Sequence, residues 1–365
     1  MGVDAPSTTG PLLAPPKTKG HFSVVRLREA WFVGCESREL KDRPLARVVQ
    51  GLPVVLFRAE GGRASALLDR CPHRNVPLSE GAVKAGLLEC RYHGWQFDGG
   101  GTCRAIPGLC GSPEGKARRA PSFATVEQEG YVYVWAEPDT EPTHAPYALP
   151  HVSDPSYSTV RRNFRVPGTI HAVAENALDV PHTAFLHGGL FRTAKKTNEI
   201  EVVVRRFADR AEAEYIGEPA PKGLAARLLA PGGGVVQHFD RFLLPSITQV
   251  EYRLGKDSHL IVNSLLTPIS DFETMLYAAV TFRMPVPHWL VRPFLQPVAV
   301  HILKQDARML GLQMNAVQRF GGEQYASTEI DVLGPQILRL LLQAQRGERP
   351  SPDMPPDEHR VTMRT

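Results

Sequence analysis

Residues 69–103, DRCPHRNVPLSEGAVKAGLLECRYHGWQFDGGGTC, contain two short combinations of cysteine and histidine. In the first, one proline separates Cys71 from His73, and in the second, two residues separate Cys90 from His93. Each combination places a thiol and an imidazole close together in the chain. Two loops built in this way can converge on one point, so the stretch predicts a metal centre.

The order of these side chains indicates which metal centre they would hold. Zinc sites usually group cysteine with cysteine and histidine with histidine. Alternating cysteine and histidine is typical of a two-iron, two-sulfide cluster, in which two thiolates bind one iron and two imidazoles bind the other. Imidazole donates less charge than thiolate, so such a cluster has a reduction potential of about −150 to +300 mV and accepts electrons readily. A zinc knuckle or a chance occurrence is the alternative.

The complete pattern, C-P-H-R…C-x-Y-H-G-W-x-F-D…G-x-C…I-P, resembles the Rieske domain of ring-hydroxylating and demethylating oxygenases. The resemblance implies that Cys71 and Cys90 bind one iron of a [2Fe-2S] cluster. It also implies that His73 and His93 bind the other iron.

Composition sets limits on the rest of the protein. The chain has 365 residues, long enough for two domains with separate cores. Its formal net charge of +4 is small and its lysines and arginines are scattered, so nothing indicates a nucleic-acid partner. Two of the five cysteines are assigned to the cluster, and we expect the other three to be reduced, as is typical of the cytoplasm.

No targeting or membrane segment is evident. Residues 1–20 contain four prolines and no long apolar run, and they predict a disordered leader. The most apolar window, residues 284–303, contains four prolines and Arg292, so it does not predict a transmembrane helix. We expect this window to line an apolar pocket instead.

The pattern of apolar residues predicts an α+β chain. Short apolar runs between polar and glycine turns predict a small all-β domain over residues 21–140. Residues 141–346 are predicted to form a second domain with a helix-over-antiparallel-sheet arrangement, and residues 347–365 a loose tail. Its predicted strands are 202–204, 235–239, 247–252, 260–266 and 276–282, and its predicted helices are about 168–188, 297–320 and 335–346.

The first of these helices contains a second group of polar residues. Asn176, Asp179, His182 and His187 form the motif N-x-x-D-x-x-H-x-x-x-x-H. Histidines five positions apart lie about 140° apart on an ideal helix, so both reach one metal only if the helix is distorted. Pro181 provides a reason for distortion, because it removes a backbone donor. Two capping or surface histidines are the alternative, and local capping is the alternative for Asn176 and Asp179.

This motif resembles the mononuclear iron site of the same oxygenase family, in its monooxygenase and demethylase branch. The resemblance implies that His182 and His187 bind iron and that Asn176 lies near it. It also implies that Asp179 accepts a hydrogen bond from His93 of a neighbouring subunit. The layout as a whole is similar to that of pheophorbide a oxygenase and aminopyrrolnitrin oxygenase, and it implies a helix-grip, START-like second domain.

A mononuclear iron of this kind needs a carboxylate besides two imidazoles. Asp306 is the best candidate, since it has apolar neighbours at helical spacing and a carboxylate on an apolar face is costly unless it is paired or bound to metal. Pairing with a buried base is the alternative. The rival carboxylates are expected at strand ends or in turns: Asp240, Asp271 and Glu273.

These implied centres predict the oxygenase component of a multicomponent monooxygenase. It would receive electrons from NAD(P)H through a separate reductase or ferredoxin docked near His73 and His93, and use O2 at a mononuclear Fe(II). We expect hydroxylation, dealkylation or desaturation of a bulky apolar substrate, aromatic or polycyclic, because no Arg or Lys cluster awaits a carboxylate. The resemblance also suggests a homotrimer. Two alternatives are an electron-transfer Rieske protein and a hydrophobic-ligand carrier with a vestigial iron site.

Overall fold

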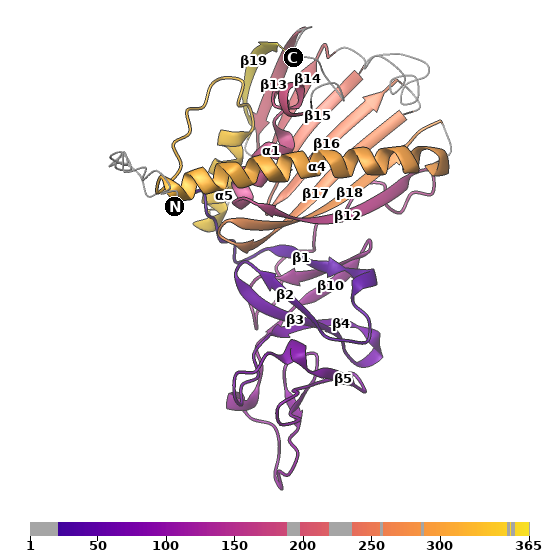
Figure 1. Ribbon diagram of the computed structural model, residues 1–365, viewed down its shortest axis with the longest axis vertical. Helices are drawn as coiled ribbons and strands as arrows, with labels where there is room; N and C mark the ends of the chain where they lie inside the picture. Colours follow the sequence, from indigo (N-terminus) through magenta and orange to yellow (C-terminus); the bar gives the residue numbers. More distant parts are fainter. Residues whose placement is uncertain are drawn as a thin grey trace, which may run out of the picture.

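The computed structural model describes residues 21–187, 198–218, 236–255, 258–285, 288–348, 351 and 355–364, with the backbone alone at 288–296 and 298. The predicted leader, residues 1–20, lies outside the described residues. Figure 1 shows two parts stacked along the long axis of the molecule, with the N-terminal part below a large sheet.

The N-terminal part consists of three small antiparallel sheets, which confirms the all-β prediction. The first has the order β1-β11-β10, with β1 at Trp31–Glu36, β10 at Thr125–Gln128 and β11 at Tyr131–Trp135. The second has the order β2-β3-β4-β9, with bounds Leu45–Val49, Leu52–Arg58, Ala64–Leu68 and Ser122–Phe123. The third, β5-β6-β7-β8, comprises Ala82–Lys84, Leu87–Glu89, Gln96–Phe97 and Cys103–Ala105. Short 3-10 turns lie at Ser37–Glu39, Glu60–Gly62, Leu78–Glu80 and Lys116–Arg118.

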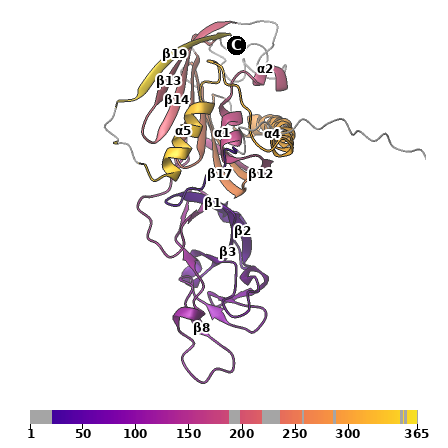
Figure 2. The same ribbon diagram turned by 90° about the vertical axis from the view of Figure 1, so that its left-hand side faces the viewer.

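The C-terminal part is an eight-stranded antiparallel sheet in the order β12-β18-β17-β16-β15-β14-β13-β19. In chain order its strands are Ser158–Pro167 (β12), Glu199–Arg206 (β13), Arg210–Ile216 (β14), Val236–Leu243 (β15), Ile247–Leu254 (β16), Ser258–Ser270 (β17), Glu273–Arg283 (β18) and Asp357–Arg364 (β19). Its helices are Ile170–Leu178 (α1), Thr183–Leu186 (α2), His288–Arg319 (α4) and Gly334–Gln345 (α5). Figure 2 shows α1, α4 and α5 on one side of this sheet, so the helix-over-sheet prediction is confirmed.

Side-chain alternation gives each face of the large sheet a different neighbour. On the inner face, Val202, Val204 and Phe242 pack in one core with residues of α1 and α5. On the outer face, Leu265 and Tyr277 pack against aromatic residues of the N-terminal part. The Tyr277 hydroxyl also donates a hydrogen bond of 2.9 Å to the Gly34 carbonyl. One sheet therefore holds the helices on one side and the N-terminal part on the other.

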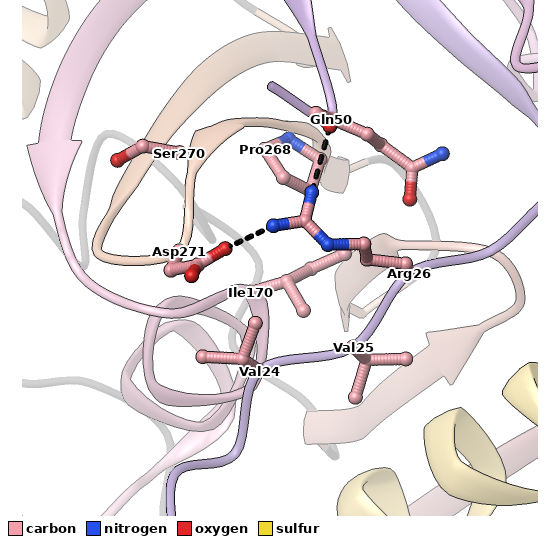
Figure 3. A pocket seen from close by; sticks show the side chains of 8 residues that line it. All are labelled: Val24, Val25, Arg26, Gln50, Ile170, Pro268, Ser270 and Asp271. Atoms are coloured by element: carbon pink, nitrogen blue, oxygen red, sulfur yellow. Dashed lines mark hydrogen bonds and ion pairs between the residues drawn. The ribbon is translucent and has the colours of Figure 1, made fainter. Parts of the chain in front are cut away.

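Beside this packing, the two parts are joined by the hydrogen bonds of Arg26 and Gln50, which we call the clasp (Figure 3). Arg26 donates to the Gln50 carbonyl at 2.9 Å and to the Asp271 carboxylate at 2.5 Å. The side-chain amide of Gln50 accepts from the Leu27 nitrogen at 2.8 Å and donates to the Leu27 carbonyl at 2.6 Å. The backbone nitrogen of Gln50 donates to the Pro268 carbonyl at 2.7 Å. Arg26 and Gln50 thus connect the N-terminal arm and the β2–β3 turn with strand β17 and the turn that follows it.

Two predictions of secondary structure are wrong. The helix expected over about 168–188 is interrupted: α1 ends at Leu178, and α2 begins at Thr183 after a break that contains Pro181. The predicted loose tail contains β19, which pairs with β13 over its full length. Ion pairs such as Arg205–Glu358 at 2.8 Å link the two strands. The charged residues that suggested a solvated tail therefore pair with opposite charges on the neighbouring strand.

The domain boundaries at residues 140 and 346 stay predictions. No helix in the described part of the chain is long and apolar enough to cross a membrane.

We predict that Gln50→Ala lowers the free energy of unfolding by about 1–3 kcal/mol, because it removes two hydrogen bonds and leaves the Leu27 backbone groups unpaired. Urea unfolding of the purified chain measures this change. The same substitution at exposed Gln237 is the control and is expected to change stability by less than about 0.5 kcal/mol. Equal effects at the two positions would show that the clasp contributes nothing.

Candidate metal centres

The two Cys/His loops have the same backbone pattern. In the first, the Cys71 nitrogen donates to the Val76 carbonyl at 2.9 Å, and the Asn75 nitrogen donates to the Cys71 carbonyl at 2.9 Å. In the second, the Cys90 nitrogen donates to the carbonyl five residues on, at 2.8 Å, and the Gly94 nitrogen donates to the Cys90 carbonyl at 3.0 Å. Asn75 and Gly94 occupy equivalent positions with φ of 61° and 71°, where the left-handed conformation suits asparagine or glycine.

These matched loops bring the four predicted cluster residues together as a thiol pair and an imidazole pair. Cys71 and Cys90 are each 2% exposed. Burial raises the pKa of Cys71 to about 11. A backbone hydrogen bond acts against this rise in the pKa, and the neighbouring thiol of Cys90 adds to it. The rings of His73 and His93 lie 4.5 Å apart. The Cys71 thiol resists ionisation and needs a cation to become a thiolate. Separate thiol and imidazole pairs suit a two-iron cluster.

Trp95 covers one of the two imidazoles. Its ring stacks on that of His73 at 4.6 Å, with 5° between the planes, whereas His93 is exposed to solvent. The Nδ1 atom of His73 is buried and has no hydrogen-bond partner among the described residues. This nitrogen is therefore available to a metal ion.

The second group lies where α1, α2 and α4 meet. The helix break places His182 just before α2 and His187 just after it, while Asp306 comes from α4. The Nε2 atoms of His182 and His187 lie 3.6 Å and 3.0 Å from the same carboxylate oxygen of Asp306. All three ligand atoms lie within 4.8 Å of one another, and within the described ranges no other group of three His, Cys, Asp or Glu side chains does so.

On the side away from this meeting point, the Nδ1 atom of each imidazole faces an oxygen atom. The Nδ1 atom of His182 lies 3.3 Å from the Asp179 carboxylate, and the Nδ1 atom of His187 lies 2.8 Å from the Gln305 side-chain oxygen. A neutral imidazole has one donor and one acceptor nitrogen. With an oxygen beside each Nδ1 atom, the neutral rings would carry the hydrogen on Nδ1 and present a lone pair at Nε2.

Three ligand atoms thus converge in a partly buried place, where Oδ1 of Asp306 has no hydrogen-bond partner among the described residues. A cation relieves their repulsion, and two imidazoles with one carboxylate are the donor set of non-heme Fe(II). The pKa of Asp306 is raised, because burial outweighs the opposite effect of the two histidines. The amide of Asn176, which donates a hydrogen bond to this carboxylate, also lowers the pKa. The residues present therefore fit ferrous iron.

The reason given above against one rival of Asp306 is wrong. Asp240 does not end a strand but lies within β15, 1% exposed, and is hydrogen-bonded to His238. Asp271 lies in the turn before β18, and Glu273 begins that strand. None of the three belongs to the group around His182 and His187.

A buried ionic cluster on the inner face of the sheet was not predicted. The Nδ1 atom of His238 lies 2.7 Å from Glu218 and its Nε2 atom 3.0 Å from Asp240. Tyr215 and Tyr252, on the flanking strands β14 and β16, stack on the His238 ring at 4.4 Å and 4.0 Å. Burial lowers the pKa of His238, but the two carboxylates outweigh it and raise the pKa to about 9.

Comparisons with known proteins agree with this geometry. Residues 30–121 match the Rieske [2Fe-2S] domain, and residues 166–346 match the vanillate O-demethylase oxygenase C-terminal domain. The chain belongs to the Rieske non-heme iron oxygenases. The family provides a [2Fe-2S] cluster and a mononuclear iron as cofactors.

Individual relatives of this Rieske oxygenase share about a quarter to a third of its residues over the matched regions. The chain is 35% identical to the dicamba O-demethylase oxygenase component of Stenotrophomonas maltophilia over 49% of its own length and 53% of that protein. It therefore spans about half the length of this relative. It is 26% identical to aminopyrrolnitrin oxygenase PrnD of Pseudomonas fluorescens over 72% of this chain and 76% of that protein.

A solved structure confirms the fold across both parts. The crystal structure of dicamba monooxygenase bound to 3,6-dichlorosalicylic acid aligns with a TM-score of 0.77 at 24% identity. The alignment covers 89% of this chain and 99% of that chain. The Rieske part and the large sheet therefore follow a known arrangement.

We predict that the ionic cluster makes stability depend on pH in the alkaline range. The pKa of His238 is raised from 6.5 to about 9, so its contribution is fully present below pH 6.5 and is lost as pH rises through 9. Denaturant unfolding across this range is expected to show a steeper decline for wild type than for His238→Gln, by about 1–3 kcal/mol. His301→Gln, at an exposed position of α4, serves as the control. Parallel curves for wild type and His238→Gln would contradict the prediction.

Proposed function

We propose that this chain is the oxygenase component of a multicomponent monooxygenase. The convergence of His182, His187 and Asp306 carries the proposal, since these residues offer a three-ligand face to one ion. Bound ferrous iron would supply oxygen activation and a bound [2Fe-2S] cluster would supply electrons one at a time. The chain's own part is to hold the three ligands, with the Nδ1 atoms of the two histidines directed away from the ion.

The residues of the other centre have the matching task. Cys71 and Cys90 would hold one iron of the cluster, and His73 and His93 the other. Burial of the thiol pair excludes water from the sulfur side, while exposed His93 leaves an edge for a partner. The loop nitrogens, fixed by backbone hydrogen bonds, would help to set the reduction potential.

Electron transfer between the two centres is proposed to cross a subunit boundary. Figure 2 shows α2 near the upper end of the molecule and β8, beside the cluster loops, near the lower end, so a path within one chain spans the long axis. Asp179 is about one-third exposed and faces Nδ1 of His182 at 3.3 Å. A head-to-tail homotrimer would bring His93 of one subunit to Asp179 of the next.

The electron donor is proposed to be a separate reductase or ferredoxin that draws on NAD(P)H. Arg74 and Arg91 are exposed beside His73 and His93, and this positive charge would attract an acidic donor. We also propose a cytoplasmic location, because the cysteines outside the cluster loops are free: Cys35, Cys103 and Cys110.

The substrate is proposed to be a bulky, mainly apolar aromatic or polycyclic compound that is hydroxylated, dealkylated or desaturated. Relatives named for dicamba and vanillate O-demethylation support an aromatic substrate. The segment 284–303, expected to line the pocket, has most of its side chains outside the described residues. An electron-transfer role alone, or ligand carriage, is less well supported because the three-ligand group is intact.

Asp306→Ala is expected to lower the iron content from about three to about two per chain, because one ligand of the mononuclear site is lost while the cluster remains. Reductase-dependent product formation from an aromatic substrate panel should fall below detection, with an unchanged cluster spectrum. Asp42→Ala, which removes an exposed carboxylate of the N-terminal part, is the control. Product formation by Asp306→Ala would contradict the proposal, and an iron content of two in wild type would favour electron transfer alone.

Complementation tests the path between subunits. Cys90→Ser lacks a cluster ligand and Asp306→Ala lacks an iron ligand, so each is expected to be inactive by itself. Co-expressed in one trimer, they should recover part of the wild-type activity, since an intact cluster then faces an intact iron site across some boundaries. No recovery in trimers shown to be mixed would refute the path between subunits.

A further inference from the structure

Gln305, the residue before Asp306 on α4, contacts the far side of a proposed iron ligand. Its side-chain oxygen accepts a hydrogen bond of 2.8 Å from Nδ1 of His187. The side chain of His187 is 2% exposed, so water does not compete effectively for this bond. Adjacent residues of one helix thus contact opposite edges of the same imidazole, Gln305 at Nδ1 and Asp306 at Nε2.

This contact has a chemical consequence for the ring. An amide oxygen only accepts hydrogen bonds, so it retains the imidazole hydrogen on Nδ1. The lone pair then stays on Nε2, which lies 3.0 Å from Asp306 Oδ1 and faces the place where the three ligands meet. A metal ion that binds there does not have to displace a proton from Nε2 or rotate the ring.

The second histidine has a different partner. Nδ1 of His182 faces the carboxylate of Asp179, at 3.3 Å. A carboxylate increases the electron density on an imidazole more than a neutral amide does, because it carries a full charge. The Asp179 side chain is also one-third exposed and is proposed to take part in the subunit contact. Gln305 is therefore the partner that stays in place whether or not a neighbouring subunit is bound.

We propose that Gln305 is a positioning residue of the mononuclear site, which holds His187 in the tautomer and orientation that bind the metal. The inference rests on the proposed function, because it takes His187 as a ligand. Gln305 does not touch the metal or the substrate, and it acts through His187.

The test uses the purified protein with its cluster intact and its mononuclear metal removed by a chelator. Binding of Fe(II), and of Co(II) as a spectroscopic probe, is measured for wild type, Gln305→Leu and Gln305→Glu. Gln305→Leu is expected to bind both ions about 10–100-fold more weakly, the usual effect of losing such a partner. Gln305→Glu keeps an acceptor and should stay within about tenfold of wild type. Gln318→Leu, at an exposed position of the same helix, should match wild type.

A second readout needs no metal. Long-range proton–nitrogen NMR of the metal-free protein should show His187 with its hydrogen on Nδ1 in wild type, and a mixture of tautomers in Gln305→Leu. A merely structural role would change the unfolding midpoint without changing the tautomer. If the leucine variant does not fold, Gln305→Asn repeats the test, because its amide is one methylene too short to reach Nδ1.

The outcomes separate this inference from the proposed function. Wild-type binding together with unchanged affinity and tautomer in the Gln305 variants overturns the role of Gln305 and leaves the iron site in place. If wild type itself binds neither ion, the proposed function fails. Weaker binding together with a mixed tautomer supports both.

Discussion

The meeting of two imidazole nitrogens with one carboxylate oxygen is the contact on which the C-terminal part depends. The Nε2 atoms of His182 and His187 both face Oδ1 of Asp306, in a place that is mostly shielded from water. Lone pairs held this close repel one another, and an unpaired buried carboxylate is costly. The three side chains stay close because the large sheet and the long helix α4 hold the backbone segments that carry them. A bound cation would change the repulsion into attraction and make the metal part of the stability of the fold.

The large sheet also connects the two parts of the chain that carry the candidate metal centres. Its inner face supports the helices that carry the proposed iron ligands, and its outer face contacts the aromatic residues of the N-terminal part. The clasp around Gln50 adds hydrogen bonds at the edge of the same junction. Because side chains alternate along each strand, one set of backbones serves both interfaces.

Local motifs were predictable and distant partners were not. Cys71, His73, Cys90 and His93 are close in sequence and carry a distinctive order, and Asp306 was found because a carboxylate among apolar neighbours is unusual. The break after Leu178 was anticipated as a distortion at Pro181 but not as a separate helix.

Other features depend on pairing between remote segments. Gln305 looks like any polar residue of an exposed helix until His187 is seen beside it. His238 and Asp240 lie two positions apart, which places them on one face of a strand, but their third partner, Glu218, comes from another part of the chain. Strand β19 was missed because its charges resemble those of a solvated tail, and only the opposite charges on β13 explain them.

The stacking of Trp95 on His73 has a consequence for how a closed assembly would be supplied with electrons. Of the two proposed cluster imidazoles, His93 is the more exposed, although the Tyr92 ring lies 3.8 Å from it, and in a ring of subunits it would face the adjoining protomer. A reductase or ferredoxin could then not reach the cluster from the side of His93. It would have to dock beside Arg74, where the indole of Trp95 covers His73. Delivery and onward transfer would thus use different sides of the same small cluster, so the donor would not have to leave before the electron moves to the next subunit.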